Sequence, residues 1–204
     1  MKSVYSGTVL KHNVRVYNSG TGPLDIYNIA VSCGCTTTDL KKHHLDPNDT
    51  TDLTIRFDTQ HFVGSVTKSI TIVSNDPVRR NLEVQFHSTI RSIFDINPIP
   101  VYFGKLPVGQ LTTVSMGIKN LEKQKIAIVS VFDSAQMISV SPGRETLNPS
   151  DSIEVHLSVT PDQAGPFAGH LVFTTDSKKQ RRITIPYYYI AVPERNQDGE
   201  QPQH

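Results

Sequence analysis

The sequence predicts an all-β protein built as two tandem immunoglobulin-like β-sandwich domains. Three observations support this prediction: short runs alternate apolar and polar residues, turn-forming residues separate the runs, and the whole pattern occurs twice. An apolar period of two places alternate side chains on one face of a strand, and no window of about 12 residues has the helical period. Short strands spaced by turns, about seven in a hundred residues, are typical of an immunoglobulin-like sandwich.

The second half of the chain is a diverged duplicate of the first. A shift of 102 residues, the difference between Gly109 and Gly7, aligns residues of the same kind along both halves. The aligned pairs include Asn18 with Asn120, Leu45 with Leu147, Pro47 with Pro149 and Asp49 with Asp151. A repeat of this length indicates two copies of one domain, because each copy is long enough to bury its own core.

The first copy contains the predicted strands in a regular order. Alternating apolar residues predict strands at Val14–Val16, Leu24–Ile26, Leu53–Phe57, Ile70–Ile72 and Leu82–Phe86. The segments between them are rich in Gly, Asn, Asp and Pro, which supply the backbone dihedral angles that turns need. The first domain is therefore expected over residues 1–91.

The second copy is expected over residues 92–192, followed by a disordered polar tail at 193–204. Its first strand is predicted at Pro100–Gly109, and a shift of 102 moves Phe103 to position 1. The matching strand of the first copy is therefore expected to lie mostly before Met1. Either an export signal and adjoining sequence precede this segment in a longer natural protein, or a real truncation leaves a groove whose sheet edge accepts a strand from another chain.

The composition excludes several classes of protein. Hydrophobic residues make up 37% of the 204 residues, charged residues make up 19%, and there is no Trp. These values are typical of a turn-rich globular chain. The formal net charge of +1 gives no overall field that would attract nucleic acid. No apolar run approaches the roughly 20 residues of a membrane helix, and the N-terminal residues lack the apolar stretch of a signal peptide.

Three motifs of the first copy point to a known family: Asn18–Gly20 (NSG), Ser32–Thr36 (SCGCT) and Leu45–Pro47 (LDP). With them, this copy resembles the bacterial immunoglobulin-like domain family of unknown function marked by SCGCT, which is similar to Hydin-type (ASH) and major-sperm-protein-like sandwiches. One departure is Asn48, where the family usually has Gly. The second copy resembles the generic Hydin-type module without the cysteines. The resemblance implies an exported location, periplasmic or cell-surface, in a Gram-negative bacterium, and no established reaction.

The two cysteines, Cys33 and Cys35, are the sharpest chemical feature of the sequence. Ala135 and Met137 take their places in the second copy, so the fold itself does not need them. Three roles stay open: a local structural disulfide or inert thiol pair, a redox or thiol-exchange site, and a soft-metal site such as Cu(I). Cysteines two positions apart form a bridge if the intervening Gly34 folds the backbone into a tight turn.

The metal hypothesis would recruit a histidine, because imidazole together with thiolate suits copper or zinc. The nearest candidates in the first copy are His43, His44 and His61. The second copy has Glu145, Thr146 and Gln163 at these positions, so histidines and cysteines are absent together. The alternative is that His43 and His44 are solvated loop residues. A closed zinc site is not expected without a second cysteine pair.

The last predicted strand, Ile183–Val192, is apolar on both faces, whereas an ordinary sandwich strand is apolar on one. Pro186 predicts an edge strand, because proline has no N–H to donate to a neighbouring strand. The outward residues Tyr188 and Ile190 are expected either to be covered by a loop or to contact a protein partner.

The sequence contains no Ser–His–Asp set, carboxylate pair or glycine-rich phosphate loop in a supporting context. We therefore expect a non-enzymatic structural or protein-binding module of an exported bacterial protein, with no cofactor, no membrane span and no nucleic-acid partner. It would bind a protein partner or assemble with itself through its sheet edges. The alternative is a periplasmic thiol-redox or copper-binding domain that acts through Cys33 and Cys35.

Overall fold

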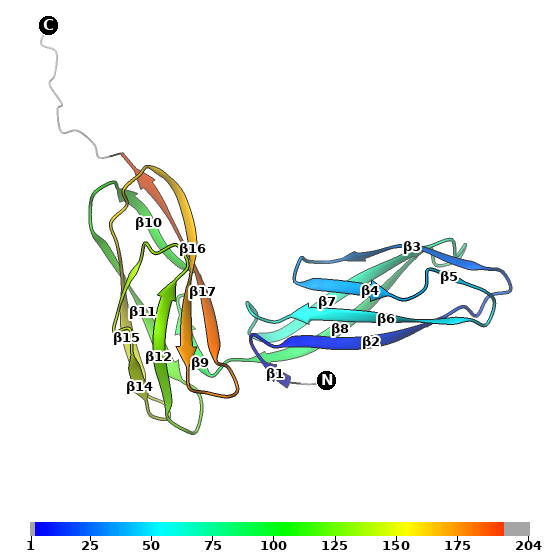
Figure 1. The fold of residues 1–204 in the computed structure, drawn as a ribbon, viewed down its shortest axis with the longest axis horizontal. Coiled ribbons are helices and arrows are strands. Elements are labelled where there is room, and N and C mark those ends of the chain that lie inside the picture. Colours follow the sequence, from blue (N-terminus) through cyan, green and yellow to red (C-terminus); the bar gives the residue numbers. More distant parts are fainter. Residues whose placement is uncertain (1–2, 194–204) are drawn as a thin grey trace, which may run out of the picture. The chain divides into compact units, whose positions relative to one another are not determined.

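The computed structural model describes residues 3–193, and every regular element among them is a β-strand (Figure 1). The chain divides into two compact units, Met1–Arg91 (unit 1) and Ser92–His204 (unit 2). Each unit packs two β-sheets face to face, because its strands are apolar on the side that faces the other sheet. The predicted fold class, two tandem immunoglobulin-like sandwiches, is confirmed.

Unit 1 contains one five-stranded and one three-stranded sheet, with strand orders β1-β8-β7-β3-β5 and β2-β6-β4. Its strands are β1 (Ser3–Tyr5), β2 (Val9–Tyr17), β3 (Leu24–Val31), β4 (Thr36–Leu40), β5 (His44–Leu45), β6 (Thr50–Asp58), β7 (Gly64–Ser74) and β8 (Asn81–Arg91).

Unit 2 contains one five-stranded and one four-stranded sheet, with strand orders β10-β17-β16-β12-β14 and β13-β15-β11-β9. Its strands are β9 (Phe94–Asn97), β10 (Val101–Pro107), β11 (Thr112–Asn120), β12 (Ile126–Asp133), β13 (Ser139–Ser141), β14 (Glu145–Leu147), β15 (Ser152–Val159), β16 (Gly165–Thr175) and β17 (Arg182–Val192).

The core of each unit follows the predicted alternation. In β6, Leu53, Ile55 and Phe57 are buried, while the residues between them are more exposed. The core cluster of unit 1 joins Leu53 and Ile55 to residues from β3, β5 and β7, namely Ile26, Leu45, Ile70 and Ile72. Each such side chain contributes about 1.5–3 kcal/mol through removal of its apolar surface from water.

The registers of the strands make the two units comparable residue by residue. Gly64 of β7 lies opposite Ile90 of β8, and Gly165 of β16 lies opposite Ala191 of β17. Gly165 lies 101 positions after Gly64, and Ala191 lies 101 positions after Ile90. Each residue of β16 or β17 is therefore equivalent to the residue 101 positions earlier in unit 1.

A buried asparagine ties the same turn in both units. Asn18 Nδ2 donates to the carbonyl of Leu45 at 2.9 Å, and Asn120 Nδ2 donates to the carbonyl of Leu147 at 3.1 Å. Both asparagines are almost inaccessible to solvent. This shared contact explains why the duplicated Asn and Leu positions align, and it assigns the NSG motif a structural role.

The turn before β6, and its equivalent before β15, requires a left-handed backbone. Asn48 has φ 66° and the equivalent Ser150 has φ 67°. Glycine adopts this conformation without strain, and asparagine tolerates it better than most residues. Asn48 therefore replaces the usual Gly of the family pattern at a position whose backbone explains both residues.

The expectation of an edge strand at Ile183–Val192 is wrong. β17 lies between β16 and β10, with antiparallel pairing on one side and parallel pairing on the other. Pro186 is accommodated because pairing with β10 begins only at the next residue, Tyr187.

The first strand of unit 1 is short. β1 has three residues and pairs in parallel with β8, whereas β10 has seven and pairs in parallel with β17. The other predicted terminal feature, the polar tail at 193–204, lies outside the described residues except for Pro193, which belongs to no strand.

Candidate functional site

Cys33 and Cys35 lie in the short loop between β3 and β4, and they form a disulfide bond with each other. Their Cα atoms are 5.3 Å apart, within the usual span of a disulfide. Both cysteines are half-buried, while Gly34 between them is exposed. In this oxidised form neither sulfur is a thiolate, so the pair offers no nucleophile and no soft-metal ligand until it is reduced.

Backbone contacts of this loop fix the disulfide to the end of the sandwich. The carbonyl of Cys33 accepts the N–H of Thr36 at 3.1 Å, and the carbonyl of Cys35 accepts the N–H of Asp58 at 2.9 Å. The buried Thr36 hydroxyl lies 3.6 Å from the sulfur of Cys33. Gly34 does not have a left-handed backbone, and a Cβ there would meet open space. The turn therefore does not depend on the left-handed backbone that glycine favours.

Unit 2 holds the equivalent loop by a different means. The buried carboxylate of Asp133, at the end of β12, accepts the N–H groups of Met137 at 2.7 Å and Ile138 at 2.8 Å. It also accepts the N–H of Ala135 at 3.2 Å and the hydroxyl of Tyr187 at 2.8 Å. One carboxylate thus crosslinks the loop to β17 without cysteine.

The two crosslinks hold equivalent loops from different positions. Asp133 pairs with Leu171 in β16, and the equivalent Val31 pairs with Ile70 in β7. Tyr187 of β17 is equivalent to Phe86 of β8. Unit 1 therefore has an apolar pair where unit 2 has Asp133 and Tyr187. The role of this carboxylate was not predicted, although an Asp that replaces an apolar residue of the duplicate is a usable sequence signal.

Tyr187 shows how deeply this contact is buried. Burial raises the pKa of the Tyr187 hydroxyl far above its ordinary value, and the hydrogen bond to Asp133 raises the pKa further. A Cβ at Gly169, opposite Tyr187 in β16, would collide with the Tyr187 ring. The tyrosine is therefore a neutral structural donor rather than an acid or base near neutral pH.

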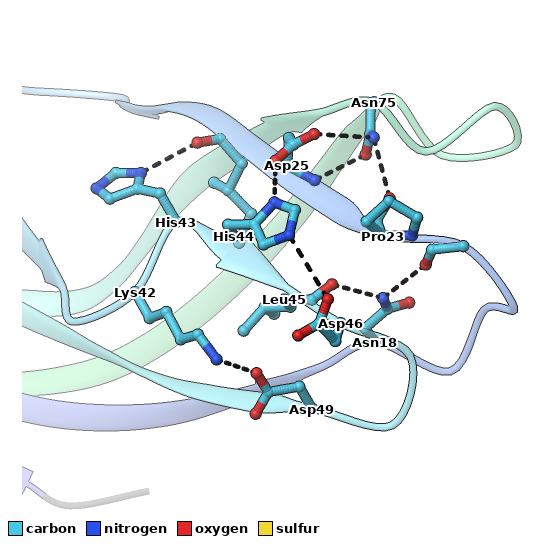
Figure 2. Close-up of polar contacts among 12 residues, drawn as sticks. Asn18, Pro23, Asp25, Lys42, His43, His44, Leu45, Asp46, Asp49 and Asn75 are labelled. Atoms are coloured by element: carbon cyan, nitrogen blue, oxygen red, sulfur yellow. Dashed lines mark hydrogen bonds and ion pairs between the residues drawn. The ribbon is translucent and has the colours of Figure 1, made fainter.

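His43 and His44 lie beside β3 and are engaged there (Figure 2). The Nδ1–H of His43 donates to the carbonyl of Ile26 at 3.0 Å. The Nδ1–H of His44 donates to the carboxylate of Asp25 at 2.6 Å, and its Nε2 lies 3.6 Å from the carboxylate of Asp46. Both ring nitrogens of His44 thus face carboxylates, which leaves neither nitrogen directed at a substrate.

The partner of His44 is itself positioned by hydrogen bonds. Asn75 Oδ1 accepts the N–H of Asp25 at 2.9 Å, and Asn75 Nδ2 donates to the carbonyl of Pro23 at 3.1 Å (Figure 2). The hydrogen bond to Asp25 raises the pKa of His44 above its ordinary value of 6.5, and the negative charge of Asp25 adds to this. The arrangement is an exposed ion pair that ties β5 to β3, with no nucleophile in it.

The predicted metal ligands do not meet in one group. In the part of the chain that the structure describes, no three His, Cys, Asp or Glu side chains are gathered so that they could hold a metal ion. Cys33 and Cys35 are bonded to each other, while His43 and His44 bond to β3. His61 follows β6 and makes contacts of its own.

The predicted partner contact at Tyr188 and Ile190 is exposed. Tyr188 is 44% and Ile190 is 38% accessible, and both point away from the core because Tyr187, Tyr189 and their inward neighbours fill it. No loop among residues 3–193 covers these two side chains fully. They remain candidates for contact with a partner.

A groove of about 380 Å³ lies in unit 1 between β2, β6 and β8. Its apolar lining consists of Leu10, Ile55, Phe57 and Phe86. Within the described residues β2 ends its sheet, whereas the equivalent β11 pairs on its other side with β9. In unit 2, Val101 of β10 lies opposite Tyr187, the equivalent of Phe86, and is buried. A strand therefore fills in unit 2 the space that is a groove in unit 1.

No helix that is long and apolar enough to cross a membrane occurs between residues 3 and 193.

Two family models match the chain, each over one unit. Residues 1–90 match the model described as a protein of unknown function (DUF1573). Residues 92–187 match the model of the HYDIN/CFA65/VesB-like, Ig-like domain. No curated protein is significantly similar to the chain.

Several solved structures are similar to parts or most of the chain at low identity. A protein of unknown function from Porphyromonas gingivalis W83 aligns with 92% of this chain over 94% of its own, at 13% identity and a TM-score of 0.44. An ASH / PapD-like domain of human CEP192 aligns with 50% of this chain over 87% of its own, at 10% identity and a TM-score of 0.41. WR4, a member of the MSP family of C. elegans, aligns with 50% of this chain over its full length, at 12% identity and a TM-score of 0.37. Unit 1 is thus similar to the DUF1573 family and unit 2 to the HYDIN/CFA65/VesB-like immunoglobulin-like family, which confirms the expected resemblance at this level.

Proposed function

We propose that this chain is a non-enzymatic, protein-binding tandem module of an exported bacterial protein. The single observation that supports the non-enzymatic role best is the pair of equivalent loops. Unit 1 closes the loop with the disulfide of Cys33 and Cys35, and unit 2 closes it with the carboxylate of Asp133. A cysteine pair that closes the loop for which unit 2 uses a purely structural carboxylate is most simply a structural crosslink. A disulfide also persists best in an oxidising compartment, which favours export.

Binding is assigned to the sheet edge of unit 1. A terminal strand presents backbone N–H and C=O groups that another strand can pair with. Within the described residues β1 pairs with β8 only at Thr89–Arg91, and beside Phe86 the edge of β8 opens onto the apolar groove that Leu10 and Phe57 also line. An extended segment with a large apolar residue at alternate positions would pair with the edge and fill the groove, as Val101 and Phe103 do in unit 2.

A peptide taken from unit 2 tests the edge. We expect a synthetic peptide of residues 100–107 to shift the NMR signals of Leu10–His12 and Phe86–Ser88, which line the groove. The same peptide with Phe103→Asp should leave them unchanged, because a carboxylate would be buried without a partner. Unit 2, whose own strand occupies the equivalent place, serves as the internal control. Equal shifts with both peptides, or shifts spread evenly over both units, would refute binding at this edge.

The half-exposed disulfide favours a second candidate function, a periplasmic thiol-redox or copper-binding site at Cys33 and Cys35. If this function were correct, the native chain would exchange its disulfide with a dithiol peptide much faster than a denatured control. The reduced chain would bind one Cu(I) per molecule, and Cys33→Ser would abolish the binding. Exchange no faster than that of the unfolded chain, together with no copper retained by the reduced protein, would remove this candidate.

A further inference from the structure

The outward face of the larger sheet of unit 2 is apolar along four paired strands, β10, β17, β16 and β12. We call it the apolar face. Its large members are well exposed: Tyr102 is 59%, Phe132 is 53%, Tyr188 is 44% and Ile190 is 38% accessible. The registers place Tyr102 opposite Tyr188 and Tyr188 opposite Ala168. Phe132 lies opposite Val172 two outward rows further along, with His170 and Pro186 in the row between. Pro166 opposite Ile190 extends the same face.

The equivalent face of unit 1 is polar. Tyr188 and Ile190 of β17 correspond to His87 and Thr89 of β8. Along β16, Pro166, Ala168 and Val172 correspond to Ser65, Thr67 and Thr71 of β7. Two units with the same sheet and the same inward core thus differ in the chemistry of one outward face.

The fold therefore does not explain the apolar face, because unit 1 builds the same sheet with polar residues at the matching positions of β7 and β8. Exposed apolar side chains scattered singly need no explanation, but a contiguous patch in strand register is typical of an interaction surface. Aromatic residues at its centre are the residue types that most often anchor protein interfaces. We propose that this face of unit 2 is a docking surface for another protein.

The charges on the face define the partner. The four strands contain a single carboxylate, that of Asp133, which is buried and bonded within the loop. Lys105 lies opposite Ile190 at one end of β17, and Arg182 begins the strand at the other end. An apolar surface bordered by cations and free of carboxylates fits a partner whose contact has an apolar centre and an acidic rim.

The same charges argue against a second copy of this face, because two copies would bring their own lysine and arginine together without a carboxylate between them. They also distinguish a protein from a glycan. Ile190, Val172 and Pro186 give the face aliphatic surface, and its polar side chains His170 and Thr184 make contacts of their own, whereas a sugar needs several placed polar groups beside its aromatic contacts. The partner assigned is therefore a protein with apolar and acidic residues.

The residues of unit 1 at equivalent positions supply the variants for the test. The face variant carries the unit 1 residues at three exposed positions, Tyr188→His, Ile190→Thr and Phe132→Ala, so it should fold as the native chain does. The reciprocal variant, His87→Tyr with Thr89→Ile, installs two of the side chains on unit 1. A third variant, Lys105→Glu with Arg182→Glu, reverses the charge. Unchanged thermal unfolding of each is the control.

A phage-displayed library of random peptides is the probe, selected on the native chain and then synthesised for calorimetry. We expect the selected peptides to combine apolar residues with an excess of Asp and Glu. They should bind the face variant about tenfold more weakly and the charge-reversed variant more weakly still at low salt. The reciprocal variant should gain a second site for them.

Several outcomes would overturn the inference. Peptides that bind the native chain and the face variant equally would move binding elsewhere, and a glycan bound by the native chain but not by the face variant would replace the protein partner. A native dimer that the face variant dissociates in sedimentation velocity would make the occupant a second copy. The inference rests on the proposed binding function, but the two fail differently. Peptides that perturb only Leu10–His12 of unit 1 would leave the proposed function standing, while no selectable peptide at all would contradict both.

Discussion

Asp133 and Tyr187 in unit 2 occupy the positions of Val31 and Phe86 in unit 1. A buried carboxylate is unfavourable unless several donors satisfy it, and Asp133 has three backbone N–H groups and one hydroxyl. Removing one partner of such a contact costs more than removing all partners together, because the groups left behind remain buried without a bond.

The first prediction concerns Asp133→Val, which copies unit 1. We expect it to lower the free energy of unfolding of unit 2 by about 3 kcal/mol or more, because Tyr187 and the N–H groups of Met137 and Ile138 lose their acceptor. The matched control is Tyr187→Phe, which removes only the hydroxyl and should cost about 1–2 kcal/mol. Hydrogen exchange resolved by unit would measure both. If both variants lowered the free energy of unfolding by the same small amount, the carboxylate would not crosslink the loop.

The second prediction at this scale is a pH dependence from His44. Its pKa is raised in the folded state by the hydrogen bond and charge of Asp25, so folding favours the protonated imidazole. The resulting stabilisation of unit 1 is fully present below the unfolded pKa of about 6.5 and is lost as the pH rises through the higher folded pKa. His44→Gln should flatten this part of the stability profile.

An NMR titration checks the assignment directly. The imidazole of His44 should titrate above its ordinary pKa, and Asp25→Asn should bring its pKa back down. The side chain of His44 is exposed, so salt should weaken the effect. A His44 pKa unaffected by Asp25→Asn would contradict the ion pair.

At the scale of elements, the loop between β3 and β4 joins the two sheets of unit 1 and receives its crosslink from Cys33 and Cys35. Closing so short a loop removes little chain entropy, and the entropy model gives a contribution of about 1.5 kcal/mol. The disulfide is therefore a local constraint on this loop rather than a condition for folding, as expected for a feature that unit 2 lacks.

The third prediction follows from that magnitude. The double variant Cys33→Ala with Cys35→Ala should still fold and lose about 1–2 kcal/mol in the urea unfolding of unit 1. Faster hydrogen exchange should be confined to the loop and to Thr36, whose N–H bonds to Cys33. Ala135→Ser in the equivalent loop of unit 2 is the control. Global unfolding of unit 1 in the double variant would show that the disulfide does more than hold a loop.

The strands themselves were predictable, but some of their neighbours were not. Period-two alternation predicted β6 at Leu53–Phe57 and β7 at Ile70–Ile72, because a strand with one buried face has apolar residues at alternate positions. It gave no information on which strand pairs with which. Pro186 suggested an edge strand, yet β17 is paired on both sides, since a proline is tolerated one residue before a ladder begins.

The candidate site was predictable to a similar extent. The cysteines of unit 1 stood out because the duplicate lacks them. The contact of His44 with Asp25 could not be predicted from spacing, because the two are brought opposite each other by the pairing of β5 with β3. The buried position of Asp133 depends likewise on the register of β12 with β16. Such contacts become visible only once the pairing of strands is known.

At the scale of the whole molecule, one sandwich plan is used twice with different surfaces. Both units share the inward core, the buried asparagine and the left-handed turn before β6 and β15. They differ in the crosslink of one loop, in the sheet edge beside the groove and in the polarity of one sheet face. Shared features are what the fold requires, and the features that differ are therefore where specific function is expected.

Native mass spectrometry of the chain from an oxidising compartment distinguishes a module with a structural disulfide from a metal-binding domain. We expect a mass lower by two hydrogens than that of the dithiol form, because Cys33 and Cys35 are bonded to each other, and no metal after exposure to Cu(I). A bound copper that is lost in Cys33→Ala would refute the structural role of the disulfide and make unit 1 a metal-handling domain.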